Sequence, residues 1–173
     1  MSEQQAPFGE QAFLQTIQEI SELCIDPAAQ IGQGVEGTVW CTPNGRYMKI
    51  GQAEIANGVT IDKCVHIEDG VTVGQDAQVG FSSTLSEGSN IGEGVQIGVA
   101  VHIGKLVEIA PHVSIGHVSR ISDGATLGPN ARIAPQAFIG RGLYVDEAVA
   151  PHQSIRTAAD DSKYPDQIST PSL

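Results

Sequence analysis

The stretch IGEGVQIGVAVHIGKLVEIAPHVSI, residues 91–115, shows the feature that decides the fold: an aliphatic residue returns at every sixth position. The same spacing runs without interruption from residue 55 to residue 145, and a small or short apolar residue stands two positions before nearly every aliphatic, with Leu143 as the large exception. A fixed short period of this kind marks a repeat architecture. The sixteen aliphatic residues are Ile55, Ile61, Ile67, Val73, Val79, Leu85, Ile91, Ile97, Ile103, Ile109, Ile115, Ile121, Leu127, Ile133, Ile139 and Val145.

Each six-residue unit predicts a short strand followed by a corner. Residues two apart in a strand face the same side, so the aliphatic and the small residue before it both point inward. The residue between them, such as Thr72 or Gln96, then faces solvent. Neighbouring coils pair through their strands at about 4.8 Å. The apolar interior closes only when the coils stack on one another.

The corner residues predict how many sides a coil has. The third residue after each aliphatic falls into three sets that recur every 18 residues, which predicts a three-sided coil. Two sets are rich in Gly, Asp, Asn and His, which tolerate positive φ, so we expect left-handed backbone at those two corners and not at the remaining one. The repeats make a little over five coils, or a prism about 25 Å long at the strand spacing. The remaining set is Cys64, Ser82, Ala100, Val118 and Gln136.

Composition excludes several classes of partner. The chain has 173 residues and a net charge of −11, which disfavours nucleic acid, because phosphate binding requires clustered Lys and Arg, and disfavours an anionic membrane surface. No apolar run approaches the roughly 20 residues of a membrane span, and the first ten residues do not resemble a secretory signal. Cys24, Cys41 and Cys64 are odd in number and widely spaced, which indicates free thiols in a reducing, cytoplasmic compartment.

The remaining segments flank or interrupt the repeats. Residues 1–24 form an N-terminal extension in which apolar residues at helical spacing predict a short amphipathic helix over 8–24, expected to cap the open end of the solenoid. The β-helix domain is expected over 25–146, with a hairpin or loop around an Asn-Gly turn at 37–51. Residues 147–173 are expected to form an exit segment and a disordered tail.

The hexads over 53–146 resemble those of the hexapeptide-repeat proteins, whose fold is a left-handed parallel β-helix. The left hand and the all-β class with three-sided coils are what the resemblance implies. It also implies an acyltransferase that takes an acyl group from CoA or an acyl carrier protein, without a permanently bound cofactor. Such enzymes are homotrimers with the site between prisms. The segment after Val145 resembles their exit segment, although the usual Gly-x-Pro is missing.

One histidine stands out within this resemblance. The stretch HVSIGHVSRISDGATLG, 112–128, resembles the corner of hexapeptide acyltransferases that act on sugars or nucleotide-sugars. The resemblance implies that His117 is the general base, which removes a proton from the hydroxyl or amine that attacks the thioester. Imidazole suits this task because its pKa lies near working pH. Val118 stands where that family has an acid, and Ser122 stands where it has a glycine.

The predicted geometry places further candidates beside His117. Phe81 and Val99 occupy the same corner on the two preceding coils, and His102 and Arg120 share an outward column on the adjoining face. An exposed apolar ridge beside cationic and imidazole groups predicts substrate binding. The competing interpretation is that Phe81 and Val99 pack a trimer and His117 takes no part in chemistry.

Two other functions stay open. A non-catalytic scaffold, or a subunit of a larger assembly, fits a repeat run with no inserted loop between residues 53 and 145. Its terminal coil or N-terminal helix would then meet a protein partner. A zinc protein similar to γ-type carbonic anhydrases is the third alternative, although Ser122 stands where a second ligand is expected, so we expect no metal. We interpret His112 as a corner residue, and His66 and His152 as surface residues.

Overall fold

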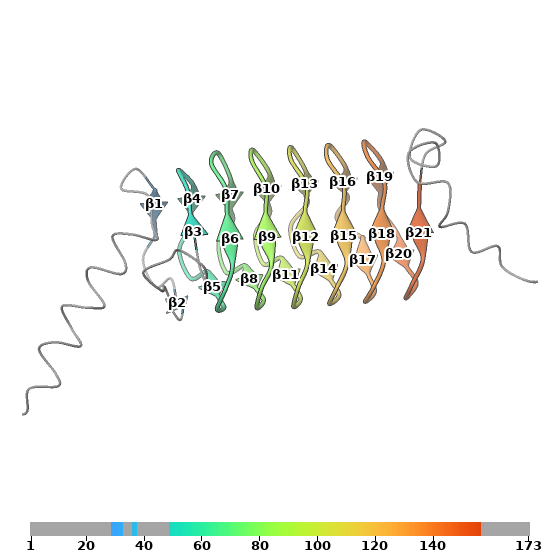
Figure 1. Ribbon diagram of the computed structural model, residues 1–173, viewed down its shortest axis with the longest axis horizontal. Helices are drawn as coiled ribbons and strands as arrows, with labels where there is room; N and C mark the ends of the chain where they lie inside the picture. Colours follow the sequence, from blue (N-terminus) through green and yellow to red (C-terminus); the bar gives the residue numbers. More distant parts are fainter. Residues whose placement is uncertain (1–28, 33–35, 38–48, 157–173) are drawn as a thin grey trace, which may run out of the picture.

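The computed structural model describes residues 29–32, 36–37 and 49–156, which form a solenoid of three parallel sheets with seven strands each (Figure 1). The chain visits the three sheets in turn, so each strand pairs with the strand three places earlier and three places later. The first sheet contains β1 (Gln30–Ile31), β4 (Glu54–Ile55), β7 (Thr72–Val73), β10 (Asn90–Ile91), β13 (Glu108–Ile109), β16 (Thr126–Leu127) and β19 (Tyr144–Val145).

The other two sheets follow the same order. The second sheet contains β2 (Glu36–Gly37), β5 (Thr60–Ile61), β8 (Gln78–Val79), β11 (Gln96–Ile97), β14 (Ser114–Ile115), β17 (Arg132–Ile133) and β20 (Ala148–Val149). The third sheet contains β3 (Lys49–Ile50), β6 (His66–Ile67), β9 (Thr84–Leu85), β12 (His102–Ile103), β15 (Arg120–Ile121), β18 (Phe138–Ile139) and β21 (Ser154–Ile155).

The core consists of the residues that the period selects, which confirms the sequence prediction. All sixteen aliphatics are at most 4% exposed, and Leu143, the exception at the small position, is only partly buried. The register places aliphatic against aliphatic across coils, as where Ile103 pairs with Leu85 on one side and Ile121 on the other. Each such burial stabilises the fold by about 1.5–3 kcal/mol.

All three corners carry left-handed backbone. We call the corner between the first and second sheets the first corner, that between the second and third sheets the second corner, and that between the third and first sheets the third corner. The expectation of ordinary backbone at the second corner is wrong: Ala100 has φ 55° and Val118 has φ 59°. From Ile55 to Val145 every side of the coil is six residues long, so the same turn recurs at nearly every corner whatever the residue type. Asn130, expected to be left-handed at the first corner, has no positive φ.

The corner amides hold the coils together. The positive-φ residue donates its N–H to the carbonyl of the corner residue one coil below, as from Ala100 to Phe81 and from Val118 to Val99, both at 2.8 Å. The strands add a second set of coil-to-coil bonds on each side. Most of the backbone hydrogen bonds of a coil are therefore made with its two neighbours.

Both ends of the solenoid extend the repeats. β2 ends at Gly37 and β3 begins at Lys49, so residues 38–48, outside the described part, connect these strands at the second corner. Ile55 follows Gly37 by 18 residues, whereas Val73 follows Ile61 by 12, so the chain holds one extra hexad and the period survives. After Val145, where the sequence placed the end of the repeats, β20 and β21 add two further sides.

The described part consists of strands and turns, and within it no helix is long and apolar enough to cross a membrane. The amphipathic helix expected over 8–24 lies outside the described residues, and so do residues 157–173 of the exit segment and tail expected over 147–173.

Candidate functional site

The second corner gathers the residues that the sequence proposed for a site. Phe81, Val99 and His117 occupy the same corner position on three successive coils, after β8, β11 and β14. Phe81 is 42% exposed, Val99 is 38% exposed and the adjacent Val118 is 57% exposed. His102 and Arg120 lead the next strands along the chain, β12 and β15, where they are register partners. The corner therefore presents an apolar column beside an imidazole and a guanidinium.

The ring of His117 is held by the coil below it. The backbone N–H of Val99 donates a hydrogen bond to Nδ1 of His117 at 2.8 Å. A neutral imidazole carries one proton, so a ring that accepts at Nδ1 carries its proton on Nε2. In this state His117 offers solvent a donor and not a base.

The same bond is made by carboxylates elsewhere. At the third corner, Asp69 accepts the N–H of Gln52 at 2.9 Å and Asp123 accepts the N–H of Lys105 at 3.0 Å. Each acceptor stands two residues after its strand aliphatic, as His117 does. A side-chain acceptor at this place satisfies an amide that the coil-to-coil carbonyls do not reach. His117 thus also has a structural role as a cap for the Val99 amide.

The surroundings of His102 favour its neutral form. Its side chain is half-buried, and burial together with the Arg120 guanidinium lowers the pKa of His102 below its ordinary value of 6.5, while Asp123 and Glu68 oppose the shift. The outward row that contains His102 and Arg120 continues along the third sheet to Phe138, the register partner of Arg120. Arg156 lies over the ring of Phe138, with its guanidinium carbon 4.9 Å from the ring centroid. This face is therefore cationic and aromatic, although the chain as a whole is acidic.

The residue directly after His117 has a strained backbone conformation. Val118 holds φ at 59° although it is β-branched, which makes it a true conformational outlier. More than half of its side chain is exposed, so burial offsets little of the cost, which is about 1–3 kcal/mol for a non-glycine residue in this region.

Two buried serines support the second corner from inside. Ser83 donates from Oγ to the carbonyl of Gly98 at 2.9 Å and accepts the N–H of Val101 at 3.1 Å, which spans the corner of the next coil. Ser119 bridges Ala134 and Ala137 in the same way. The sequence showed these serines only as small residues at inward positions. The sequence signal that could have identified Ser83 and Ser119 is their position: each directly precedes a strand of the third sheet, and the two lie two coils apart.

The remaining histidines do not join this site or form a metal centre. His112 lies at the first corner with φ 62°, and His152 lies at the second corner with φ 59°. His66 heads β6, two strands from His102 in the third sheet. Within residues 29–32, 36–37 and 49–156, no group of three or more His, Cys, Asp or Glu side chains could hold a metal ion.

Comparisons with known proteins identify the fold. A scan against protein-family models finds no match, and a comparison with curated proteins finds none either. Solved structures do match. A histidine-to-alanine mutant of GDP-perosamine N-acetyltransferase from Caulobacter crescentus, in complex with CoA and GDP-perosamine, aligns with a TM-score of 0.52 at 17% identity. The chain is a parallel β-solenoid built from six-residue repeats.

The solenoid spans only part of the length of the proteins that it matches. The match includes 75% of this chain and 54% of the perosamine acetyltransferase, so the chain spans about half the length of that enzyme. A UDP-N-acetylglucosamine acyltransferase from Bacteroides fragilis aligns with a TM-score of 0.44 at 16% identity, over 76% of this chain and 68% of that one. At 17% identity, the alignment with the perosamine acetyltransferase shows the fold alone.

Proposed function

We propose that this hexapeptide-repeat protein is an acyltransferase with its site at the second corner. The observation that carries the proposal is the exposed imidazole of His117 in a column with exposed Phe81 and Val99, beside neutral His102 and cationic Arg120. The acyl donor is a thioester, on CoA or an acyl carrier protein, and no cofactor stays bound. The mutant enzyme that shares the fold was crystallised with CoA and GDP-perosamine, which supports a thioester donor and an amine or hydroxyl acceptor.

The proposed reaction needs one proton acceptor. The acceptor's oxygen or nitrogen attacks the thioester carbonyl carbon and its proton passes to Nε2 of His117. The carbon–sulfur bond then breaks, and the leaving thiolate takes the proton back from the imidazolium. Phe81 and Val99 would flank the acyl or pantetheine portion, and His102 would accept a hydrogen bond from the substrate as a neutral imidazole. Arg120 would pair with phosphate or with an acidic carrier surface.

The hydrogen bond from Val99 sets a condition on this mechanism. Nε2 can take a proton only when Nδ1 carries the ring's own proton, and Nδ1 then no longer accepts the Val99 N–H. Substrate binding must therefore move the ring or shift its tautomer. Exposure of the side chain leaves room for that movement.

The assembly and location follow the same proposal. The exposed apolar column of Phe81, Val99 and Val118 would become buried between prisms of a cytoplasmic homotrimer, which places the corner at a subunit interface. We also propose the left-handed coil that the hexads imply. Sedimentation equilibrium would measure the number of chains, and a crystal structure would establish the hand and the residues at the interface.

A non-catalytic scaffold is the second candidate, and one observation favours it. His117 makes the hydrogen bond that Asp69 and Asp123 make at the third corner. A residue whose only function is to cap an amide needs an acceptor atom and no proton transfer.

Two substitutions of one residue separate these functions. His117→Asn keeps an acceptor near the Val99 amide but cannot exchange a proton, and His117→Ala removes both. The assay measures thiol release from acetyl-CoA and longer acyl-CoAs, and product from acyl carrier protein by mass spectrometry, with nucleotide-linked amino sugars as acceptors. We expect both variants to lose at least about 100-fold in rate, the scale of general base catalysis.

The control is His112→Ala, which removes an exposed imidazole from the first corner. It should keep the wild-type rate. Full activity in the stable His117→Asn variant would remove His117 from the mechanism. A wild-type protein that neither binds nor turns over any thioester in the panel would support the scaffold.

A further inference from the structure

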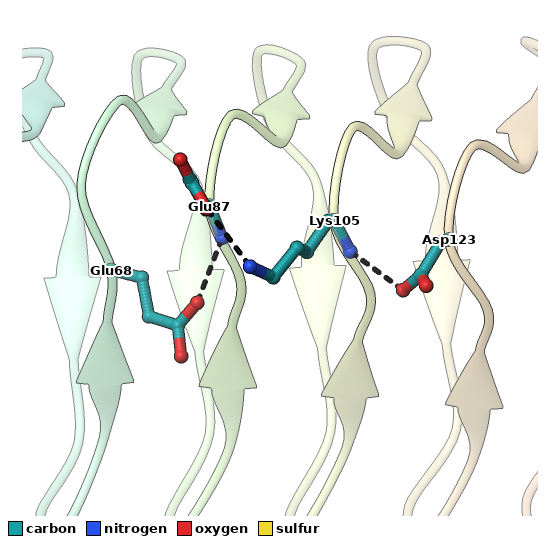
Figure 2. A network of polar contacts seen from close by, with 4 residues as sticks. All are labelled: Glu68, Glu87, Lys105 and Asp123. Carbon is teal, nitrogen blue, oxygen red and sulfur yellow. Dashed lines mark hydrogen bonds and ion pairs between the residues drawn. The ribbon is translucent and has the colours of Figure 1, made fainter.

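The third corner carries an ordered row of charges on successive coils. Lys105 Nζ contacts Glu87 Oε2 at 2.9 Å, and Arg141 contacts Asp123 at 3.1 Å. Figure 2 shows Glu87, Lys105 and Asp123 at this corner, where the Lys105 ammonium points toward the Glu87 carboxylate. The hydrogen bond that Lys105 donates to Glu87 raises the pKa of Lys105, which stays charged. The row therefore alternates as minus, plus, minus, plus from Glu87 to Arg141.

An exposed leucine interrupts the glycines of the same corner. Leu106 is 69% exposed and holds φ at 54°, whereas its counterparts on the other coils are Gly70, Gly88, Gly124 and Gly142. Its side chain leans toward the N-terminal end, since a Cβ added at Gly88 would lie 2.8 Å from Leu106 Cδ2. A Cβ at Gly124 would meet only the Cα of Gly142 at 4.0 Å, and one at Gly142 would meet nothing within 4 Å. An apolar projection thus stands one coil from a bare stretch of backbone.

We propose that two copies of this protein associate antiparallel along this ridge, defined as residues 87–88, 105–106, 123–124 and 141–142. The two-fold axis passes between the coils of Lys105 and Asp123. A two-fold contact pairs residue i with j and j with i. Lys105 of each copy then meets Asp123 of the other, and Glu87 meets Arg141. Leu106, displaced toward Gly88, falls on the bare stretch between Gly124 and Gly142 of the second copy.

Two neighbouring positions of the axis fail on charge. An axis through the coil of Lys105 places the two lysines against each other. An axis between the coils of Glu87 and Lys105 pairs Glu87 of each copy with Lys105 of the other. It also places Asp69 of one copy against Asp123 of the other, and these two carboxylates repel. Of these three positions, only the one between Lys105 and Asp123 pairs every charge of the ridge with its opposite and gives the leucine an open place. Electrostatic complementarity of this kind fixes register.

The contact is narrow, so the association is weak. Three coil spacings separate Glu87 from Arg141, or about 14 Å, and an interface this short belongs with the transient class. Exposed ion pairs contribute little each and are screened by salt. We therefore expect dissociation constants of roughly 0.1–1 mM at low salt.

Charge reversal tests the pairing in the full chain. Sedimentation velocity from about 50 μM to 1 mM protein at low salt should show mass increasing toward twice its dilute value. Lys105→Glu should abolish the increase, because the new carboxylate would face Asp123 of the other copy, and Asp123→Lys should do the same by setting two ammonium groups together. The double variant K105E/D123K restores opposite pairing across the axis and should recover association to within about threefold of wild type. Arg132→Glu, on the outward face of β17, makes the same charge change away from the ridge and should have no effect.

The leucine is tested separately. Leu106→Gly matches the neighbouring coils and removes strain, so the chain stays folded while association falls by at least about fivefold. Association that survives both L106G and K105E, or that is unchanged in salt of about 0.5 M, would overturn the proposal. A failure of the double variant to regain association would overturn this register. The inference concerns the third corner and does not rest on the proposed acyltransferase site or on the trimer proposed at the second corner.

Discussion

The second and third corners of the coil share one turn geometry but meet it with different residues. At the third corner the left-handed position holds glycine on four coils and Leu106 on one, and carboxylates cap the amides from outside. At the second corner it holds Cys, Ser, Ala, Val, Gln and His on the described coils, and serines bridge two of the corners from inside.

This difference shows where the fold is under strain. Glycine adopts positive φ without steric cost, whereas an ordinary residue loses about 1–2 kcal/mol there. The second corner accumulates that cost on successive coils and exposes apolar side chains as well. Strain of this kind persists where surrounding structure fixes it and is common at functional sites, which agrees with the site proposed there.

Removing a serine that supports the second corner should have the largest effect. Ser83→Ala leaves the part-buried Gly98 carbonyl and the buried Val101 amide without a partner, so we expect a loss of about 2–3 kcal/mol in the free energy of unfolding. Urea unfolding with an unchanged m-value measures it. Ser89→Ala is the matched control: this Oγ is buried and has no partner among the described residues, so the loss should stay below about 0.5 kcal/mol. Equal losses in the two variants would show that Ser83 does not support the corner.

Placing a β-branched residue at the third corner should have the next largest effect. Space at Gly124 is open, so Gly124→Val costs only backbone strain, and we expect it to destabilise by about 1–3 kcal/mol. Gly124→Asn should cost less, because Asn tolerates this region. Urea unfolding of the two variants beside wild type measures both losses. A valine at 124 that costs nothing would mean that third-corner glycines are not required for conformation.

The reverse substitution at the second corner should stabilise the single chain slightly, measured in dilution at which the proposed trimer is dissociated. Val118→Gly relieves the left-handed strain but adds backbone entropy to the unfolded chain, for a net gain of about 0.5 kcal/mol. Val118→Ala, which removes only the branched side chain, should lie between wild type and glycine. Thermal unfolding of the three proteins in parallel measures the order. A large loss in V118G would indicate that the valine packs against another chain.

A small pH effect should come from His102. Its pKa is lowered in the folded state, so below about pH 6.5 the unfolded chain binds more protons and stability falls as pH falls. Solvent screening keeps this to a fraction of a kcal/mol between about pH 7.5 and 5. His102→Thr, which copies Thr84 on the preceding coil, should flatten the slope of unfolding free energy against pH, and Arg120→Gln should flatten it partly. A slope unchanged in H102T would assign it to other groups.

The sequence predicted the core because burial is periodic. Each inward position from Ala53 to Val145 follows from the alternation of inward and outward residues within a single strand. These positions can therefore be recognised without knowledge of the tertiary structure. The second-corner backbone was not predicted, because Cys64, Ala100 and Val118 do not favour positive φ. The equal length of the three sides was the signal that all corners must turn alike.

The site was predictable in part. Residues 18 apart share a corner, so the stacking of Phe81, Val99 and His117 followed from the period once the coil had three sides. The hydrogen bond from Val99 to the His117 ring could not be foreseen, because it depends on the ring's rotamer and not on spacing. The bridging role of Ser83 could not be predicted either, because a pattern based on residue size does not distinguish serine from alanine.

The corner bonds between residues 18 positions apart have a consequence for how this protein can change length. Deleting or duplicating one complete turn of the spiral removes or adds a layer whose upper and lower surfaces match those already present. The extra hexad between Gly37 and Ile55 keeps the same phase. Growth in whole layers would let such a chain be trimmed or lengthened while the rest of its architecture stays as it was.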